Sequence, residues 1–293
     1  MRQTLSLTYF LFLLLVLVVP TKARAEIVTQ GDFVIDCEVV GENCQATLLS
    51  YSGNASHLVL PATFQCLGRT WDLVRIGDQF AQPFIDNDTL ESVVLPEYVA
   101  EIAPAAFYNC ALLSSVTLNR RTSVIGDYAF ARCKSLKEIS FPYSLTYIGY
   151  AAFSACSLDS VTVPPNVTTM VGHTFDGTPL KVLRMLTHTP PACSFSMDED
   201  VCSACRLIVP LGFSERWLGI DPWQKFASIV EMADPGDINA DRSADITDLN
   251  ILINVILGQD NTDDYEGRDD INQDQVVDIA DLNFLINYIL GNY

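Results

Sequence analysis

Residues 113–153, LSSVTLNRRTSVIGDYAFARCKSLKEISFPYSLTYIGYAAF, contain two copies of one short sequence repeat, and further copies follow on both sides. Phenylalanines recur at a nearly constant interval, at Phe107, Phe130, Phe153 and Phe175. Each stands at the same offset after a leucine that opens its unit, and these opening positions are Leu90, Leu113, Leu136 and Leu158, with Leu180 opening a fifth unit. A period of about 20 to 29 residues indicates a solenoid.

Each unit predicts a short strand at its start, because apolar residues stand at the third and fifth positions after the opening leucine and share one face of a pleat. These inward pairs are Val93/Leu95, Val116/Leu118, Ile139/Phe141, Val161/Val163 and Leu183/Met185. The alternate positions are expected to face water: Ser92, Ser115, Glu138, Ser160, Thr117, Ser140, Thr162 and Arg184. Stacked coils then form a parallel sheet, since no single coil buries its apolar groups alone.

Further inward positions complete each coil. They are Val99, Leu145 and Val167, where Thr122 interrupts the series, and Ile102, Ile125, Ile148 and Met170. The phrases SVIGDYAFARCKSLKEISFP and SLTYIGYAAFSACSLDSVTVP resemble the leucine-rich repeat of BspA-type bacterial surface proteins. The resemblance runs from about Phe33 to Glu231. It implies a leucine-rich repeat solenoid of parallel β-sheet coils, mostly β with irregular connections, and a role in surface adhesion or host-protein binding.

Residues 1–25 have the features of a signal peptide. Arg2 precedes an apolar run from Leu7 to Val19, and Ala23-Arg24-Ala25 has the small-x-small form of a cleavage site. A retained membrane anchor is the alternative, but it requires about 20 apolar residues. We expect a secreted or cell-surface protein with no membrane span after signal cleavage.

Charge and residue types narrow the function classes. The formal net charge is −19, and an acidic surface repels phosphate, which argues against nucleic-acid binding. His57, His173 and His188 are the only histidines, and none has a serine, cysteine or carboxylate at a spacing typical of a catalytic triad or metal motif. The sequence therefore predicts a protein that is not an enzyme.

The nine cysteines fall into two groups. Cys110, Cys133 and Cys156 occupy the same position in successive units, where a strand spacing of ~4.8 Å exceeds the ~3.8 Å between Cβ atoms that a disulfide prefers. These three are predicted to be buried thiols. The other six lie in the flanking segments, where disulfide pairing or free thiols both remain open: Cys37, Cys44, Cys66, Cys193, Cys202 and Cys205. Cys202 and Cys205 form a CxxC. Neither a second CxxC nor a cluster of histidines accompanies it, which argues against a zinc or redox site.

The composition changes after Glu231. Residues 232–235 form a short hinge, and residues 233–293 contain 14 acidic residues against Arg242 and Arg268. The segment from Asp237 to Gly258 returns as the segment from Asp270 to Gly291, and 15 of 22 paired positions are identical. An acidic disordered tail would have no reason to keep this spacing, so the pattern indicates an internal duplication.

Each copy places oxygen ligands at positions 1, 3, 5, 7, 9 and 12 of a calcium-binding loop. The first set is Asp237, Asn239, Asp241, Ser243, Asp245 and Asp248, and the second is Asp270, Asn272, Asp274, Val276, Asp278 and Asp281, where Ser243 and Val276 contribute carbonyls. Apolar residues at helical spacing follow both loops, which predicts two amphipathic helices and two Ca²⁺ ions.

A calcium loop followed by a helix, twice, is similar to the type I dockerin, over Gly236 to Gly291. The resemblance implies a small all-α pair of calcium loop-helix motifs that binds a cohesin-like domain or a surface scaffold protein. Two departures concern loop position 6, where Arg242 and Gln275 replace the usual glycine, and positions 10 and 11. The latter are Ile246/Thr247 and Ile279/Ala280, which argues against a cellulosomal cohesin as partner.

These patterns predict a signal peptide over residues 1–25, a repeat domain with N-terminal and C-terminal caps over 26–231, and a dockerin-like domain over 232–293. The leading function is a non-enzymatic exported binding protein whose repeat face engages a host matrix protein or a glycan. The alternative is a non-catalytic subunit of a polysaccharide-binding or polysaccharide-degrading assembly. A third possibility is that the C-terminal domain pairs only with another copy of itself.

Overall fold

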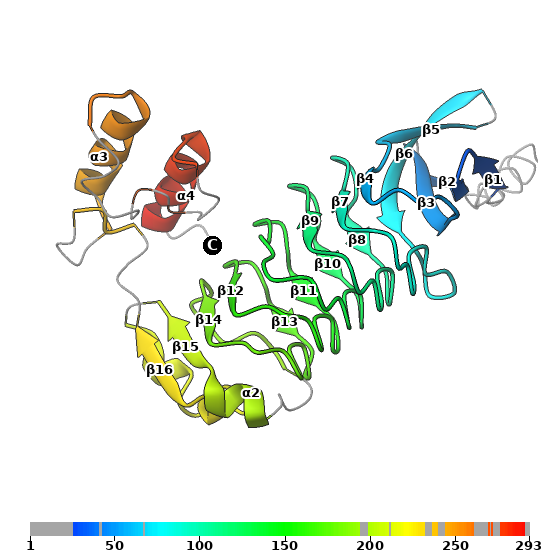
Figure 1. The fold of residues 1–293 in the computed structure, drawn as a ribbon. Coiled ribbons are helices and arrows are strands. Elements are labelled where there is room, and N and C mark those ends of the chain that lie inside the picture. The colour runs from blue at the N-terminus through cyan, green and yellow to red at the C-terminus, as the bar shows by residue number, and fades with distance from the viewer. Residues whose placement is uncertain are drawn as a thin grey trace, which may run out of the picture.

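A computed structural model describes residues 26–40, 43–66, 68–193, 199–210, 212–231, 236–239, 244–260, 269, 271 and 276–290. The predicted signal peptide, residues 1–25, lies outside these described residues. The rest forms a curved solenoid with a small pair of helices beyond its C-terminal end, as the fold class predicted (Figure 1). No helix within the described ranges is both long and apolar enough to cross a membrane.

The N-terminal cap is built from longer strands than the repeats. It contains β1 (Glu26–Gln30), β2 (Phe33–Val40), β3 (Asn43–Tyr51), β5 (Thr63–Cys66) and β6 (Arg69–Ile76). The first three pair antiparallel, whereas β3 pairs parallel with β6. This pairing converts an antiparallel start into the parallel stacking of the coils, so that the cap covers the first coil.

The polar side of the repeats is formed by two short parallel sheets, which we call the repeat face. One contains β4 (His57–Val59), β7 (Ser92–Val94) and β9 (Ser115–Thr117). The other contains β12 (Ser160–Val163), β14 (Val182–Met185), β15 (Arg206–Val209) and β16 (Ser228–Glu231). In β4, β7, β9, β12 and β14 the inward residues are buried and the alternate residues reach solvent, as the period of two predicted.

A second set of strands, which the sequence pattern indicated only as inward positions, forms a parallel ladder on another side of the coils. It consists of β8 (Glu101–Ile102), β10 (Val124–Ile125), β11 (Tyr147–Ile148) and β13 (Thr169–Met170), and it continues the cap sheet through β6. The isoleucine or methionine of each strand is fully buried. The coils are therefore joined by backbone hydrogen bonds along this ladder as well as along the repeat face where its strands form.

The phenylalanine ladder is confirmed. Ring centroids of Phe107 and Phe130 lie 5.1 Å apart, and those of Phe130 and Phe153 lie 5.4 Å apart, in stacked orientation. The ladder begins one coil earlier than predicted, because Phe84 stacks on Phe107 at 4.8 Å. Phe84 stands one repeat interval before Phe107, so the repeat period itself contained this signal.

The three cysteines of the repeats are free thiols that donate hydrogen bonds to the coil before them. Cys133 Sγ donates to the carbonyl of Phe107 at 3.2 Å, and Cys110 and Cys156 do the same to Phe84 and Phe130. In the next coil Thr178 Oγ1 takes this role toward Phe153 at 2.8 Å. A hydroxyl replaces the thiol, so this position is used as a hydrogen-bond donor.

One predicted strand is not formed. Residues 138–141 lie between β9 and β12 but belong to no strand, so the repeat face is interrupted there. Phe141 is an aromatic residue where other coils carry a smaller aliphatic one, and its ring packs against Phe153 at 5.5 Å. Beside this interruption Leu118, Ile139 and Phe141 are only partly buried.

The C-terminal cap closes the solenoid with α2 (Glu199–Ala204), η1 (Ser214–Arg216) and η2 (Trp223–Lys225). Trp217 and Trp223 are fully buried, with ring centroids 5.1 Å apart in an edge-to-face arrangement. Beyond the cap lie α3 (Ile246–Ile256) and α4 (Ile279–Leu290). We call the described residues that contain both helices the C-terminal module, namely residues 236–239, 244–260, 269, 271 and 276–290. The module has its own small cluster of buried residues, formed by Ile238, Leu252, Ile271, Phe284 and Leu285.

Candidate functional site

The outward row of the repeat face is accessible, as the sequence predicted. Ser115, Thr117, Glu138, Ser140 and Ser160 are exposed. Ser92, Thr162 and Arg184 complete the row and are partly exposed. The row is thus continuous from the N-terminal half to the C-terminal half of the solenoid, across the interruption at residues 138–141.

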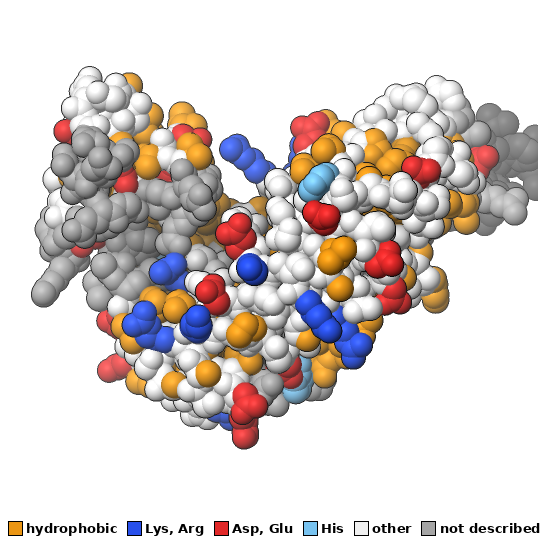
Figure 2. Space-filling view, in the orientation of Figure 1, with side chains coloured by type: hydrophobic (Ala, Val, Ile, Leu, Met, Phe, Trp, Pro, Cys, Tyr) orange, Lys and Arg blue, Asp and Glu red, His pale blue; other side chains and the backbone are white. Residues whose placement is uncertain are grey.

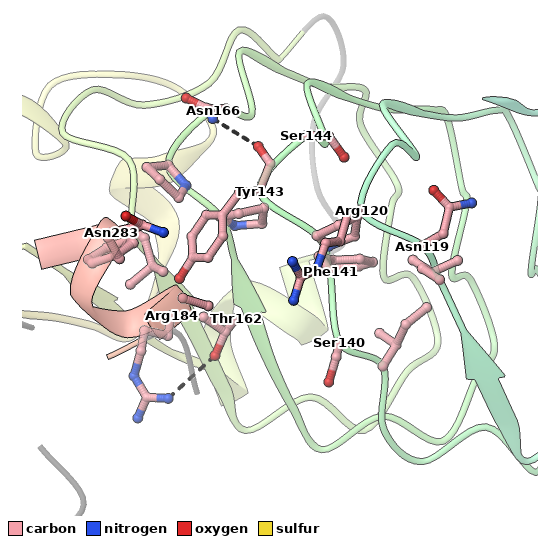
Figure 3. A pocket seen from close by; sticks show the side chains of 18 of the residues that line it. Asn119, Arg120, Ser140, Phe141, Tyr143, Ser144, Thr162, Asn166, Arg184 and Asn283 are labelled. Atoms are coloured by element: carbon pink, nitrogen blue, oxygen red, sulfur yellow. Dashed lines mark hydrogen bonds between the residues drawn. The ribbon is translucent and has the colours of Figure 1, made fainter. Parts of the chain in front are cut away.

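A cavity of about 740 Å³ lies over the C-terminal half of this row. Five of the outward residues line it, namely Glu138, Ser140, Ser160, Thr162 and Arg184. The opposite wall belongs to α4, through Ile279, Ala280, Asn283, Phe284 and Asn287. Figure 3 shows Asn283 on α4 across from Tyr143 and Asn166 of the solenoid. Because the two walls are far apart in the sequence, only the folded chain brings them together.

The wall formed by the repeats combines aromatic and hydrogen-bonding groups. Phe141 and Tyr143 supply rings, and the half-buried Leu118 and Ile139 supply apolar surface beside them. Arg184 Nη1 donates a hydrogen bond to Thr162 Oγ1 at 3.4 Å. Burial and, secondarily, the nearby Arg206 lower the pKa of Arg184. An arginine still carries its charge at neutral pH, so the wall presents a cation that solvent screens only in part.

Aromatic contacts hold α4 beside the solenoid. The ring centroids of Tyr143 and Phe284 lie 5.2 Å apart, and those of His188 and Tyr288 lie 5.8 Å apart. His188 in turn stacks on Phe213 of the C-terminal cap at 4.5 Å. The C-terminal module is therefore anchored at two points, one on the repeats and one on the cap. Figure 2 shows the surface hollowed between the module and the solenoid.

A histidine and a serine that no sequence motif connects are paired on the repeat face. His57 Nδ1 lies 2.8 Å from Ser92 Oγ, since the two residues are partners in the β4/β7 ladder. Both side chains are on an open sheet surface, and in the described part of the chain no carboxylate bonds the other ring nitrogen. Without an orienting carboxylate the pair lacks the third member of a hydrolytic triad, and it is a cross-strand hydrogen bond.

Four of the six predicted ligands of the first calcium loop are described, and they surround the start of α3. Asp245 caps the helix by accepting a hydrogen bond from Thr247 N at 2.7 Å, which lowers the pKa of its carboxyl. Asp248 is fully buried and accepts from the backbone N–H groups of Ile238, Asn239 and Asp245 at 2.7 to 3.0 Å. One carboxylate thus fastens the beginning of the loop to the first turn of the helix.

The second loop repeats this arrangement where it is described. Asp278 accepts from Ala280 N at 2.6 Å, and the buried Asp281 accepts from Asp278 N at 2.9 Å. Val276, whose carbonyl was predicted at position 7, has a largely exposed side chain. The remaining predicted ligands lie outside the described residues: Asp241, Ser243, Asp270, Asn272 and Asp274.

The residues that are described fit a calcium ion. The ligating atoms offered by the side chains of this loop are carboxylate and amide oxygens, from Asp237, Asn239, Asp245 and Asp248. Ca²⁺ prefers such oxygen ligands, whereas transition metals favour nitrogen and sulfur ligands. Asp237 and Asp248 are buried carboxylates, and a buried negative charge requires compensation. Within the described ranges, which omit five of the twelve predicted ligands, no three His, Cys, Asp or Glu side chains form a ready metal cluster.

Comparison with known proteins agrees with both parts of the fold. Residues 75–181 match the BspA type leucine rich repeat region in six copies, and residues 235–290 match the dockerin type I domain. A search of curated proteins finds no match.

Among solved structures, a leucine-rich repeat protein from Bacteroides ovatus ATCC 8483 is similar, with a TM-score of 0.51 and 20% identity over 69% of this chain and 52% of that one. A leucine rich cell surface protein from Faecalibacterium prausnitzii A2-165 has a TM-score of 0.47 and 24% identity, over 71% of this chain and 55% of that one. This chain therefore spans about half the length of both structures. The chain thus contains a BspA-type leucine-rich repeat region and a C-terminal type I dockerin domain.

Proposed function

We propose that the chain is an exported, non-enzymatic binding protein. Its repeat face engages a protein or glycan ligand, and its dockerin domain attaches it to a cohesin-like domain or surface scaffold through a calcium-dependent contact. Both kinds of domain are typical of extracellular or cell-surface proteins, which supports export through cleavage after residue 25. We place the repeat domain at residues 26–231 and the dockerin domain at 232–293.

The observation that carries the proposal is the accessible polar row of the repeat face. A row of small polar residues that runs across stacked strands offers regularly spaced hydrogen-bonding groups to an extended ligand. The partly exposed apolar residues Leu118, Ile139 and Phe141 lie beside the row and add contact surface. Aromatic and aliphatic groups of this kind supply much of the binding energy at interfaces.

We propose that two calcium ions complete the dockerin domain. The first would be held by Asp237, Asn239, Asp241, Asp245, Asp248 and the carbonyl of Ser243. The second would be held by Asp270, Asn272, Asp274, Asp278, Asp281 and the carbonyl of Val276. Calcium supplies positive charge that offsets the clustered carboxylates. The protein residues meanwhile cap the helices and close each loop against its first turn.

A pull-down from the envelope of the source cell tests the attachment. The bait is the full chain in calcium, with Asp237→Ala/Asp270→Ala as the matched inactive bait. We expect a cohesin-like or scaffold protein to be retained by the first bait only, and retention by both baits would contradict calcium-dependent attachment. A screen of purified protein against extracellular-matrix proteins and glycans identifies the ligand class of the repeat face.

The cavity favours a second candidate, a non-catalytic subunit of a polysaccharide-binding or polysaccharide-degrading assembly. Glycoside hydrolysis requires two carboxyl groups positioned on either side of the bond. Glu138 is the only carboxylate among the described residues that line the cavity, so the lining supplies only half of such a pair. Turnover of any glycan by the purified chain would contradict the assignment as a non-enzyme.

A further inference from the structure

The cavity between the repeat face and α4 has two walls of different origin. The repeats contribute aromatic rings, hydroxyls and Arg184, while α4 contributes the amide groups of Asn283 and Asn287. Both asparagines are exposed, so their amide groups are open to solvent in the cavity. A volume of about 740 Å³ is within the range of small-ligand sites.

The groups that line the cavity suit many weak, directional hydrogen bonds. Asn283 and Asn287 line it with exposed amides that can both donate and accept, whereas Asn119 and Asn166 also line it but donate to backbone carbonyls of the solenoid. Ser140, Ser144, Ser160 and Thr162 add hydroxyls. Phe141 and Tyr143 add ring surface on which an apolar face can pack. A sugar ring has this same combination of many hydroxyl groups and an apolar face.

Charge distinguishes between classes of sugar. The charged residues that line the cavity are Arg120, Arg184 and Glu138, so the net charge of the lining is close to zero. The whole chain carries a formal charge of −19, however, and the aspartates of the second loop lead directly into α4. Long-range repulsion from these carboxylates disfavours a polyanion. The cavity is therefore better suited to an uncharged chain of sugars.

We propose that the cavity is a binding site for a neutral oligosaccharide, and that α4 of the dockerin domain forms one of its walls. The proposal rests on the proposed function in that it names a ligand class for the repeat face. It adds that the dockerin domain is part of the ligand site as well as an attachment module. Ligand binding on the repeats thus depends on the folded dockerin domain.

Differences between the two dockerin copies support this role for α4. The helices are identical at most paired positions, but Ile251 and Val255 of α3 correspond to Phe284 and Tyr288 of α4. These two aromatic rings are the ones that contact Tyr143 and His188. The second copy therefore carries larger rings where α4 meets the solenoid, and Figure 1 shows α3 on the side away from the repeats.

The duplication supplies a matched control for the test. Asn283 and Asn287 line the cavity, whereas Asn250 and Asn254 occupy the same positions in α3 and do not. Titration calorimetry in calcium would use cellohexaose, xylohexaose and mannohexaose as neutral probes and hexagalacturonate as an acidic one. We expect at least one neutral hexasaccharide to bind. Asn283→Ala/Asn287→Ala should weaken it at least tenfold, and Asn250→Ala/Asn254→Ala should leave its Kd within twofold.

A second variant tests the wall while leaving the cavity asparagines in place. Phe284→Ile/Tyr288→Val installs the residues that the first copy already carries. Because Phe284 also belongs to the buried cluster of the module, the helical signal of the variant in calcium is measured first to show that the dockerin domain stays folded. We expect the α4 contact to loosen, hydrogen exchange to accelerate in peptides that contain Tyr143 and His188, and the neutral probe to bind at least fivefold more weakly. Unchanged exchange and unchanged affinity together would overturn the proposal.

The remaining outcomes separate this inference from the proposed function. Binding of a neutral probe with equal affinity by wild type and both α4 variants would overturn the role of α4 while leaving a glycan-binding repeat face. Tighter binding of hexagalacturonate than of every neutral probe would overturn the ligand class. Failure of all neutral probes to bind wild type would overturn the cavity as a neutral oligosaccharide site, and the calcium-dependent pull-down would still test attachment on its own.

Discussion

The repeat region and the dockerin domain are both built by repeating a short sequence, but they repeat different kinds of residue. The coils of the solenoid repeat buried apolar groups, and each phenylalanine of the ladder stacks on the next. The dockerin copies repeat aspartates, and their shared core is a small cluster of five buried residues. From this difference we expect the solenoid to be stable through burial and hydrogen bonding between its coils, and the dockerin domain to need additional stability from a bound cation.

Calcium removal should give the largest difference between the two regions. We expect excess chelator, or Asp237→Ala/Asp270→Ala, to abolish the helical signal of α3 and α4. At free calcium of about 100 times Kd each site contributes roughly 2.7 kcal/mol, so two contribute about 5, which is comparable with the stability of a small domain. Circular dichroism at a helix-sensitive wavelength during calcium titration measures the loss.

The solenoid should stay folded under the same conditions, and tryptophan fluorescence provides the control. The chain has three tryptophans, and all lie in the repeat domain, at Trp71, Trp217 and Trp223. Their emission should not change on chelation. A helical signal that persists in excess chelator would contradict the coupling of calcium binding to folding.

The next largest effect should come from disrupting the phenylalanine ladder. Phe130 is fully buried between Phe107 and Phe153, so Phe130→Ala removes contacts with coils on both sides. We expect a loss of about 3 to 5 kcal/mol in the free energy of unfolding, measured by denaturant titration of tryptophan fluorescence. Phe80 is 82% exposed, and Phe80→Ala should change this free energy by less than about 0.5 kcal/mol. Equal effects of the two variants would contradict the stacking of the coils.

A smaller effect should separate hydrogen bonding from packing at the cysteine position. Cys133→Val removes the thiol that donates to the carbonyl of Phe107, whereas Cys133→Thr keeps a donor, as Thr178 does in its own coil. Because the two substitutes have nearly the same shape, the difference between them reports the hydrogen bond. We expect the valine variant to be less stable by about 1 to 2 kcal/mol. A more stable valine variant would show that packing alone determines this site.

The same thiols should resist alkylation in the folded protein. Burial raises the pKa of Cys156 to about 12. The pKa of Cys133 is also raised, mainly by a hydrogen bond with Cys110 and secondly by burial. A raised pKa means that the reactive thiolate is scarce at pH 8. Mass mapping should find Cys110, Cys133 and Cys156 unlabelled before unfolding and fully labelled after unfolding without reductant. A disulfide between any two would contradict the spacing of the coils.

The smallest effect is expected on the outer surface of the repeat face. Ser115 and Thr117 are exposed, and neither contributes to the core. Ser115→Ala and Thr117→Ala should each change the free energy of unfolding by less than about 0.5 kcal/mol. A larger loss would mean that outward residues help to hold the coils together, and the contrast between ladder and surface would fail.

The elements that follow from a period could be predicted from the amino-acid sequence alone. The regular interval between phenylalanines located the buried ladder, and the duplication located both loops and both helices. The strand period also identified the outward polar row, because alternate residues of a strand point to opposite faces. Phe84 was missed although the same interval reaches it. The break at residues 138–141 was missed because this unit keeps the same alternation of apolar residues as the units that do form strands.

The cavity that the dockerin domain closes on the repeat face, by contrast, depends on tertiary packing. Tyr143 and Phe284 meet although they lie in different domains, and no repeat period connects the two. The substitution of aromatic residues into α4 was visible in the sequence, but an aromatic residue on a helix is equally compatible with the helix's own core. Which surface such a ring meets depends on where the folded chain places α4 relative to the solenoid. Contacts between separately folded units depend on their placement in space, and local periodicity contains no information about that placement.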